Sequence, residues 1–410
     1  MHVIKVAILG FGTVGEGVYK TIQSHAEELR AELGKKVEVA AVLIKNKKKQ
    51  REINKEILVT TDFAEILNLP QLDIVIEAIV ETEPTFSFLK MAIEKGCNII
   101  TANKEMFAHH GKELLELAEE NNVSVGFEAT VAGGIPVIQT LRQLLKINRI
   151  QMVQGILNGT SNFILTEMRE KKQPFAKALR LAQENGFAEA DPTNDVEGFD
   201  AFYKTMILSR IAFGAEPKWQ DVEREGITSI TSELIDIAEN AELRFKHIAQ
   251  INKIENQIHA TVKPVLVCGE HPFYHVEGVQ NAVHIHSDIV GEITLQGPGA
   301  GMFPTASAVI EDLVYVSQHP PAKRSLTSEK VSTGNLKKDL IKEVWLVHGL
   351  SYIETNSLVT KVEQLAEKTF ILRAAKHDLE QITCQHAPLV YYPILGEYAP
   401  AQQPPVLTVL

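Results

Sequence analysis

The segment "VIKVAILGFGTVGEGV", residues 3–18, decides the fold of the first part of the chain. A run of β-branched and aliphatic residues leads into Gly10-x-Gly12-x-x-Gly15, and a helical pattern follows from residue 14 to residue 29. In a dinucleotide-binding turn the first glycine permits the tight turn, the second lets the backbone approach a pyrophosphate, and the third lets helix and strand pack closely. The free N–H groups at the helix start then bind the phosphates. The segment therefore predicts a Rossmann-type domain that binds a dinucleotide.

The end of the second strand, "KVEVAAVLI", distinguishes between two cofactors. Domains that prefer NAD usually carry Asp or Glu there, which binds the ribose 2′-hydroxyl group. Here the strand ends in Ile44-Lys45-Asn46, and further cations follow at Lys47, Lys48, Lys49 and Arg51. Most of these cations are expected in a solvated loop. The absent acid nevertheless favours NADP, with Lys45 as the contact to its 2′-phosphate, and leaves NAD possible.

Strands and helices continue to alternate up to residue 129. The pattern predicts helices at 62–68, 84–95 and 111–121, and strands at 72–79, 98–102 and 123–129. Such an alternation with short loops predicts a parallel, doubly wound sheet, whose ligands lie beyond the carboxyl ends of its strands. The segment "TANKEM" lies at one of those ends, so Lys104 is expected beside the nicotinamide.

Length and composition limit the kinds of protein this chain can be. A chain of 410 residues is too long for one core, so two or three domains are expected. Its 45% hydrophobic and 23% charged residues are typical of a soluble globular protein. A net charge of −11 argues against nucleic acid or an anionic membrane as a partner. No apolar run reaches the roughly 20 residues of a membrane span.

The N-terminus and the cysteines predict a cytoplasmic protein. The N-terminus enters a strand pattern at once, which leaves no room for a signal peptide. Cys97, Cys268 and Cys384 are few, odd in number and scattered, as free thiols in a reducing compartment are. None lies in a motif that would make it a nucleophile.

After residue 150 the alternation stops, and the pattern becomes that of an α+β domain. Helices are expected at about 158–168, 174–185 and 198–213, and strands at 149–157, 260–269, 282–289 and 291–297. The segment "GPGAGMFPTASAVIEDLVYV" is predicted to return to the first domain as a loop and a helix. The predicted organisation is a dinucleotide-binding domain at 1–134 completed by helix 300–316, a second domain at 135–299, a linker at 317–336 and a C-terminal module at 337–410.

The segment "GFAEADPTNDVEGFDAFYKTMIL", residues 186–208, ends in a helix that is apolar nearly all round yet carries Asp200 and Lys204. The two residues are four apart and share one helix face. An exposed ion pair fits such a helix poorly, because a helix without a polar face is normally buried. A partly desolvated ammonium group held by a carboxylate is a candidate proton donor to a carbonyl oxygen that receives a hydride.

The residues around this helix suggest the substrate class. Glu189 and Asp195, on the preceding loop, could bind a substrate ammonium group. The segment "NGTS" offers Thr160 and backbone N–H groups near a helix start, which suit a carboxylate. An ammonium and a carboxylate together describe an amino acid.

The segment "EATVAGGIPVIQTLRQLL", residues 128–145, joins the two predicted domains. Gly133-Gly134 permits a turn, and Pro136 suits the first turn of the following helix. Such a loop can present several carbonyl groups to a small hard cation, or it can be a structural turn. The residues themselves leave both readings open.

Over roughly residues 3 to 316 the chain resembles the homoserine dehydrogenase family. The resemblance rests on "GFGTVG", "TANK", "NGTSNFIL", "GFAEADPTNDVEGFDAFYK" and "GPGAG", of which the long acidic stretch is the most specific. That family reduces L-aspartate 4-semialdehyde to L-homoserine with NAD(P)H, on the route to threonine, methionine and isoleucine. It forms dimers through the second domain's sheet, so a homodimer or homotetramer is expected.

The resemblance implies a role for each matching position. Lys204 would be the proton donor, and Lys104 would lie between nicotinamide and substrate as a second catalytic lysine that acts with Asp200. The implied substrate residues are Glu189, Asp195, Asp200, Gly159, Thr160 and Gly186. The implied cofactor residues are Gly10, Phe11, Gly12, Thr13, Val14, Gly15, Lys45, Lys104 and Gly301. The implied sodium ligands, mostly backbone oxygens, are Glu128, Val131, Gly133 and Ile135.

Two segments depart from the family pattern. Glu81-Thr82 stands where many relatives are glycine-rich, which leaves the contacts beside the nicotinamide open. The tail offers the strand "EVWLVHGL", a helix at 356–368, the strand "TFILRAAK", a second possible helix and the strand "LVYYPILG". This order suggests a degenerate ACT-like module, but the acidic-x-Pro-Gly turn is missing, so threonine feedback does not follow.

Two rival functions are weighed against this reading. A phosphorylating semialdehyde dehydrogenase needs a thiolate nucleophile, and no cysteine here has a suitable context. A catalytically inactive NADP-binding regulator would be expected to lack the lysines or their acidic partner, yet Lys104, Asp200 and Lys204 are all present.

Overall fold

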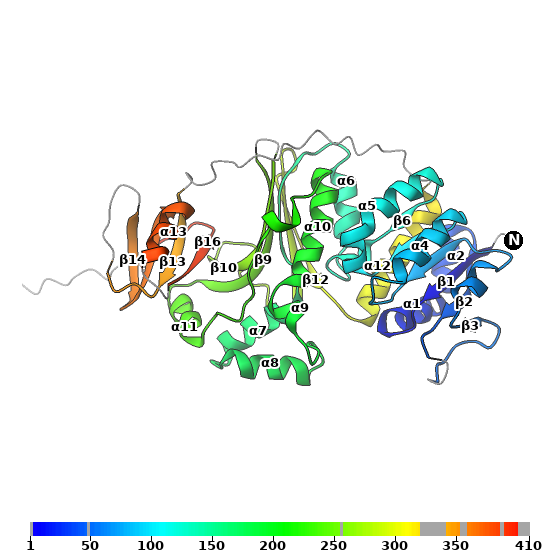
Figure 1. Ribbon diagram of the computed structural model, residues 1–410, viewed down its shortest axis with the longest axis horizontal. Helices are drawn as coiled ribbons and strands as arrows, with labels where there is room; N and C mark the ends of the chain where they lie inside the picture. Colours follow the sequence, from blue (N-terminus) through cyan, green and yellow to red (C-terminus); the bar gives the residue numbers. More distant parts are fainter. Residues whose placement is uncertain are drawn as a thin grey trace, which may run out of the picture.

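The structure is a computed structural model that describes residues 3–46, 50–254, 257–319, 342–352, 359–385 and 389–400. It contains two sheets with helices packed against them (Figure 1). The lysines at 47–49 and most of the predicted linker lie outside the described residues. Within the described ranges no helix is long and apolar enough to cross a membrane.

The first sheet has six parallel strands in the order β3-β2-β1-β4-β5-β6. The order reverses between β1 and β4, and dinucleotides bind at such a switch point in this fold. The predicted doubly wound parallel sheet is therefore confirmed. Its strands are β1 Val3–Leu9, β2 Lys36–Leu43, β3 Leu58–Thr60, β4 Ile74–Glu77, β5 Asn98–Thr101 and β6 Val125–Gly126.

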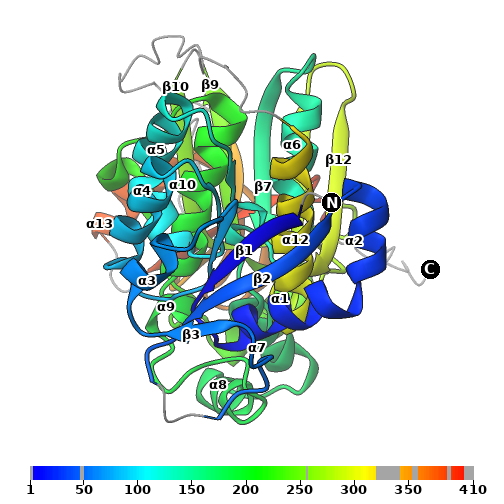
Figure 2. The ribbon, with the colours of Figure 1, turned by 90° about the vertical axis from the view of Figure 1, so that its right-hand side faces the viewer.

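Helices cover both faces of this sheet because successive strand residues point to opposite sides. Val6 and Ile8 of β1 pack with helices α1, α2 and α12, whereas Ala7 and Leu9 pack with α3, α4 and α5. Figure 2 shows α1, α2 and α12 together beside the sheet. The helices are α1 Thr13–Ser24, α2 Ala26–Leu33, α3 Phe63–Leu67, α4 Thr85–Glu94, α5 Lys104–Glu120 and α12 Met302–Gln318.

Two helix predictions in this part of the chain are corrected. The helix expected at 14–29 is two helices, because the chain leaves the helical conformation at His25. The helix expected at 111–121 begins at Lys104, because the Asn103 side chain accepts a hydrogen bond from the Met106 N–H group at 3.0 Å. This N-cap starts the helix seven residues early and makes Lys104 its first residue.

The second sheet begins with five antiparallel strands in the order β12-β11-β7-β9-β10. Strand β9 was not predicted, because it carries buried Lys246 and His247 in place of a plain apolar pattern. Strand β8 and helix α11 were also missed. The elements are β7 Ile150–Ile156, β8 Glu223–Arg224, β9 Arg244–Ile254, β10 Gln257–Val267, β11 Gln280–Ser287, β12 Glu292–Pro298, α6 Val137–Leu144, α7 Gly159–Glu170, α8 Phe175–Glu184, α9 Thr193–Val196, α10 Phe199–Phe213 and α11 Ser232–Asn240.

Helix α10 lies between the second sheet and α5, which explains why it is apolar nearly all round. Met206, Ile207 and Leu208 share one core cluster with residues of β7, β9, β10 and β11 and with residues of α5. Gly198, at φ +79°, precedes the first residue of the helix, and Gly214, at φ +71°, follows its last. The predicted helix at 198–213 is therefore confirmed within one residue.

The C-terminal module extends the second sheet. Its strands lie in the order β16-β13-β15-β14 and are antiparallel to one another, whereas β16 pairs in parallel with β10 through Leu266–Ile394 and Val267–Leu395. The helix predicted at 356–368 is wrong, because residues 360–366 pair with β15 as a strand. The elements are β13 Lys342–His348, β14 Thr360–Ala366, β15 Thr369–Ala375, α13 Lys376–Gln385 and β16 Val390–Leu395.

Candidate active site

Three helices begin at one place between the two sheets. Lys104 is the first residue of α5, Asn158 is the N-cap of α7, and Asp200 lies in the first turn of α10. Helix N-termini carry partial positive charge and free N–H groups, so this place favours anions. It lies beyond the carboxyl end of β5, as the sequence pattern predicted for Lys104.

The Asp200 carboxylate connects the two lysines. Its Oδ1 lies 2.7 Å from the Lys104 Nζ, and its Oδ2 lies 2.7 Å from the Lys204 Nζ. Asp200 is 4% exposed and Lys204 is 8% exposed, whereas the Lys104 side chain is 46% exposed. The predicted pair of Asp200 and Lys204 is therefore buried, and Lys104 joins it from the solvent side.

The Lys204 ammonium group has one N–H to spare. It donates to Asp200 Oδ2 and to the Leu157 carbonyl oxygen at 2.6 Å. The Asn281 side chain also donates to this carbonyl, at 2.9 Å. A protonated lysine has three N–H groups, so one remains for a substrate oxygen.

The pKa values of the two lysines shift in opposite directions, because the Asp200 charge dominates at Lys104 and burial dominates at Lys204. Burial lowers the pKa of Lys204, and the neighbouring Asp200 only partly opposes this effect. The charge of Asp200 raises the pKa of Lys104. Burial alone would raise the pKa of Asp200, but the Lys104 and Lys204 charges outweigh it and hold that pKa well below the usual range. The Asp200 carboxylate therefore lies between a lysine with a lowered pKa and a lysine with a raised pKa.

Asn158 links the carboxylates of the site to the start of α7. Its Nδ2 donates to Asp195 Oδ1 at 2.7 Å and to Asp200 Oδ2 at 2.9 Å, while its Oδ1 caps the Ser161 N–H group at 2.8 Å. Burial raises the pKa of Asp195. Asn158 was not singled out from the sequence, although an Asn before a predicted helix is a recognisable N-cap signal.

The loop after α8 is attached to the start of α7. The Thr160 hydroxyl group donates to the Phe187 carbonyl oxygen at 2.7 Å, and the exposed Gly186 beside it has φ +73°. Gly159 packs so closely that a Cβ atom there would lie 2.7 Å from the Val279 carbonyl oxygen. The structure thus brings these three predicted substrate residues together around one loop.

Glu189 is not brought into the lysine cluster. Its side chain is exposed, and its carbonyl oxygen accepts a hydrogen bond from Gln183 Nε2 at 3.1 Å. Of the predicted acidic substrate residues, Asp195 and Asp200 therefore lie at the lysines, whereas Glu189 lies on the solvent side of the loop.

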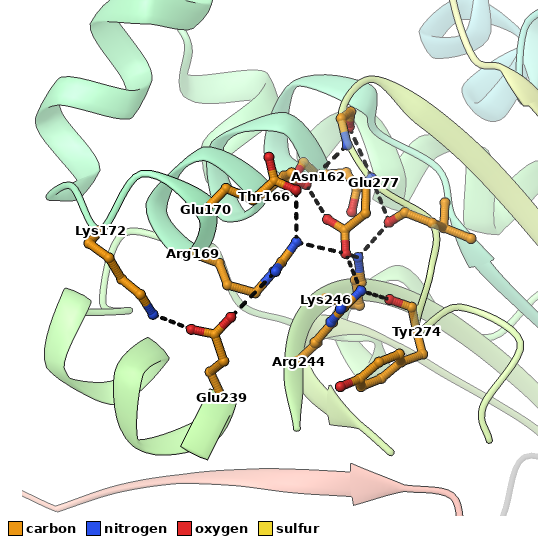
Figure 3. Close-up of polar contacts among 12 residues, drawn as sticks. Asn162, Thr166, Arg169, Glu170, Lys172, Glu239, Arg244, Lys246, Tyr274 and Glu277 are labelled. Carbon is orange, nitrogen blue, oxygen red and sulfur yellow. Dashed lines mark hydrogen bonds and ion pairs between the residues drawn. The ribbon is translucent and has the colours of Figure 1, made fainter. Parts of the chain in front are cut away.

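A cluster of charged residues holds the far side of α7 in place (Figure 3). Glu277 accepts from Thr166 at 2.8 Å and lies within 3.3 Å of three cations, Arg169, Arg244 and Lys246. Asn162 donates to the carbonyl oxygens of Val276, Gly278 and Gln280. These contacts attach the loop at 276–280 to α7, whose N-terminus lies at the site. The contacts between α7 and this loop join residues more than a hundred positions apart, and Arg244 lies 33 positions from Glu277, so no local sequence pattern predicts them.

The glycine-rich turn fits a dinucleotide. Gly10 has φ +90°, and a Cβ atom there would lie 2.6 Å from the Ala78 carbonyl oxygen. A Cβ atom at Gly15 would lie 2.0 Å from the Gly10 carbonyl oxygen, whereas nothing lies within 4 Å of one at Gly12. Gly12 is the N-cap of α1 and offers no side-chain hydrogen bond, so the first N–H groups of the helix are available to a phosphate.

The other predicted cofactor residues surround this turn. Phe11 is buried and packs edge-on against Tyr19, so its side chain supports the turn from within. Thr13 and Val14 are the first two residues of α1, and Gly301, at φ +120°, is the N-cap of the neighbouring α12. Lys45 is exposed at the end of β2, where its Nζ lies 3.0 Å from Glu81 Oε1. Glu81, which departs from the family pattern, thus contacts Lys45, the lysine expected to bind the 2′-phosphate.

A buried glutamate supports the start of α5. Glu77, fully buried at the end of β4, lies 2.5 Å from both the Thr101 hydroxyl group and the Ile79 N–H group. The Thr101 hydroxyl oxygen accepts from the Asn103 N–H group at 3.0 Å, and Asn103 caps the helix that begins with Lys104. Burial raises the pKa of Glu77 to about 8. Nothing in the sequence marks Glu77, because a lone acid at a strand end is also common in solvated turns.

The turn between the sheets has an unusual backbone. Ala132 and Gly133 have φ +56° and φ +57°, and the left-handed region is strained for alanine. The Glu128 carboxylate accepts from the N–H groups of Ile138 and Gln139 at 2.7 and 2.8 Å. Since these bonds cap α6, this carboxylate is committed to the helix, and a cation here would depend on backbone oxygens.

The described thiols are not nucleophiles. Cys97 is fully buried, and burial raises the pKa of its thiol to about 11. Burial also raises the pKa of the Cys268 thiol. Neither lies among the residues of the candidate site, which agrees with the prediction of inert, free cysteines and argues against thiolate chemistry there.

Two family models match most of the chain. Residues 10–128 match the homoserine dehydrogenase NAD-binding domain, and residues 136–314 match homoserine dehydrogenase. The homoserine dehydrogenase of Bacillus subtilis (strain 168) is 42% identical over 321 residues, which cover 78% of this chain and 74% of that protein. That of Neisseria gonorrhoeae (strain ATCC 700825 / FA 1090) is 41% identical over 318 residues, 78% and 73% of the two chains.

Solved structures agree with these matches. A homoserine dehydrogenase from Thiobacillus denitrificans superposes with a TM-score of 0.86 at 32% identity, over 96% of this chain and 98% of that chain. A hyperthermophilic archaeal homoserine dehydrogenase in complex with NADPH superposes with a TM-score of 0.67 at 29% identity, over 77% and 98% of the two chains.

Proposed function

The chain belongs to the homoserine dehydrogenase family, and from that premise we propose how its residues carry out the reaction of an NAD(P)-dependent oxidoreductase. The substrate pair is L-aspartate 4-semialdehyde and L-homoserine, and Lys204 supplies the proton. One observation carries this proposal. A buried carboxylate, Asp200, lies 2.7 Å from each of two lysines at the cofactor edge of the first sheet.

The proton reaches the substrate oxygen from Lys204. Its ammonium group is oriented by Asp200 and by the Leu157 carbonyl oxygen, which leaves one N–H directed away from both. When bound, the cofactor supplies the hydride. Because burial lowers the pKa of Lys204, this ammonium group gives up its proton more readily than an exposed lysine does. In the reverse direction the neutral amine accepts the hydroxyl proton of homoserine.

Lys104 and the helix N-termini stabilise negative charge. The Lys104 ammonium group stays protonated beside Asp200, so it can stabilise the oxygen on which charge develops. The N–H groups at the start of α7, beyond the Asn158 cap, suit the substrate carboxylate. Asp195 and Glu189 are proposed to bind the substrate ammonium group, with Glu189 reaching inward from its exposed loop.

A steady-state assay tests this function and the cofactor preference together. Purified protein is given L-homoserine with NADP or with NAD, and the formation of reduced cofactor is followed by absorbance. We expect turnover with both cofactors and a higher kcat/KM with NADP, because Lys45 replaces the acid that binds an NAD ribose. No turnover of homoserine with either cofactor would contradict the function, and a clear preference for NAD would contradict only the role of Lys45.

The turn at residues 128–135 is proposed to bind a sodium ion through the backbone oxygens of Glu128, Val131, Gly133 and Ile135. The consecutive left-handed residues Ala132 and Gly133 support this, because such strain persists where the surroundings require it. We expect a higher Tm in sodium chloride than in choline chloride at equal ionic strength. Identical melting curves in the two salts would contradict a sodium site.

The C-terminal module is proposed to be a degenerate ACT-like fold. Its strand order β16-β13-β15-β14 and its helix between β15 and β16 support a ferredoxin-like arrangement, in which β14 takes the place of the second strand. No effector is proposed for it. The protein is further proposed to act in the cytoplasm as a homodimer or homotetramer, and a single-chain mass in sedimentation equilibrium would contradict the assembly.

A further inference from the structure

The two lysines stand on helices that run side by side. Helices α5 and α10 are neighbours in both views of the molecule (Figures 1 and 2). Lys104 meets Asp200 at their N-termini, and further along Glu105 accepts from the Tyr203 hydroxyl group at 3.4 Å. Both helices therefore have their N-termini at the site. Their separation decides whether the Asp200 carboxylate can bind both ammonium groups.

A buried arginine joins the two helices beyond the site. Arg210 of α10 donates from Nη1 to the Phe107 carbonyl oxygen at 3.2 Å and from Nη2 to the Ala108 carbonyl oxygen at 3.0 Å. Its Nε donates to Glu216 at 2.6 Å, in the segment that follows α10. Arg210 is only 5% exposed. One planar guanidinium group thus binds both Glu216, just after α10, and the backbone of α5.

A glycine on α5 makes room for this group. A Cβ atom at Gly111 would lie 2.5 Å from the Arg210 Nη1. Gly111 lies inside α5, where glycine weakens a helix relative to alanine. The close approach of the Arg210 guanidinium group therefore explains why glycine stands at position 111, although glycine does not favour a helix.

The ring contacts of α5 fix its position less strictly. His109 packs against Tyr203 of α10 with ring centroids 5.8 Å apart and stacks on Trp219, in the segment after α10, at 4.4 Å. Ring packing is weakly directional and tolerates small sliding movements, whereas two hydrogen bonds from a rigid guanidinium group do not.

We propose that Arg210 is a positioning residue that sets the distance between Lys104 and Lys204 by fastening α5 to α10. The guanidinium group binds Glu216 and the Phe107 and Ala108 carbonyl oxygens, and it acts through the two helix backbones. This inference rests on the proposed roles of the two lysines. A displacement of about 1 Å at a reacting group can lower a rate by roughly a hundredfold, so the position of α5 matters for turnover.

Substitutions of Arg210 itself are the first test of the proposal. We expect Arg210→Met to lower kcat by about ten- to a hundredfold while the KM for NADP changes less than about threefold, because Arg210 binds α5 and Glu216 and not the glycine-rich turn. Arg210→Lys keeps the charge but lacks the planar, forked guanidinium group that holds these three acceptors, so its kcat should fall between those of wild type and Arg210→Met. Arg180→Met, at an exposed helix arginine, is the matched control. Active sites are counted by NADPH binding, so that loss of folded protein does not lower the apparent kcat.

Gly111→Ala tests the same contact from the opposite helix. Alanine favours the helix but displaces the guanidinium group, so the variant should fold and still lower kcat with the KM for NADP kept. Glu116→Ala, at an exposed position of α5, is its control. If Arg210→Met does not fold, Gly111→Ala alone decides the matter.

A crystal structure of Gly111→Ala separates this inference from the proposed function. A Lys104–Asp200 distance lengthened beyond 4 Å together with a lowered kcat supports the positioning role. The same lengthening with an unchanged kcat would support the positioning but contradict the catalytic role of Lys104. An unchanged distance and an unchanged kcat, or a loss of activity that lies in KM alone, would overturn the inference.

Discussion

Lys204→Met is expected to lower the kcat for semialdehyde reduction by at least about a hundredfold, the usual effect of removing a general acid. Methionine has nearly the volume and shape of the lysine stem, and the rest of α10 is already buried among apolar side chains. Asp200 keeps Lys104 as its partner, so the substitution leaves no unpaired buried charge. The loss should therefore appear in the chemical step and not in folding.

The measurement is steady-state kcat together with a titration of NADPH binding by its fluorescence. NADPH affinity should stay within about threefold of wild type, because the glycine-rich turn is untouched. Lys112→Met, at an exposed lysine of α5, controls for the loss of a positive charge. A purified Lys204→Met enzyme that reduced the semialdehyde at a rate near wild type would contradict Lys204 as the proton donor.

Asp200→Asn is expected to lower kcat by about ten- to a hundredfold at neutral pH and to change its pH dependence. Asp200 raises the pKa of both Lys104 and Lys204, so a neutral side chain there lowers both pKa values. Reduction needs protonated Lys204, and its rate falls as the pH rises through the Lys204 pKa. In the variant this fall should therefore begin at lower pH.

The rate of homoserine oxidation should depend on pH in the opposite direction, through the same Lys204 amine. Oxidation needs neutral Lys204, so its rate rises with pH in the wild type, and in Asp200→Asn the rise should begin at lower pH. Asp191→Asn, at an exposed carboxylate of the same acidic stretch, should leave both profiles unchanged. The measurement is kcat against pH in both directions. Profiles of Asp200→Asn that coincide in shape with wild type would show that this carboxylate does not control the lysine.

The sequence determined the parts of this protein that depend on neighbours along the chain. The glycine-rich turn was predictable because a strand, a turn and a helix N-terminus lie within sixteen consecutive residues. The pair of Asp200 and Lys204 was predictable because residues four apart share a helix face and the surrounding helix is apolar. The alternation of the first part likewise predicted a parallel sheet, and the observed strands β1 to β6 are parallel.

Errors arose where distant segments override a local pattern. Residues 360–366 form a strand because β15 pairs with them, although their sequence also suits a helix. Strand β9 carries buried Lys246, whose charge is tolerated because Glu277 and the Val276 carbonyl oxygen lie beside it. Neither partner is adjacent to it in the chain.

Only the tertiary structure decided how the predicted residues meet. The Lys104 ammonium group lies beside Oδ1 of Asp200, and the Leu157 carbonyl oxygen orients Lys204. Arg210 of α10 binds the backbone of α5. Glu189 is exposed on its loop. Periodicity and turn chemistry act between residues close in sequence, so they specify helices and strands. The distances between catalytic groups depend instead on how those elements pack, and packing is set by contacts between residues far apart in the chain.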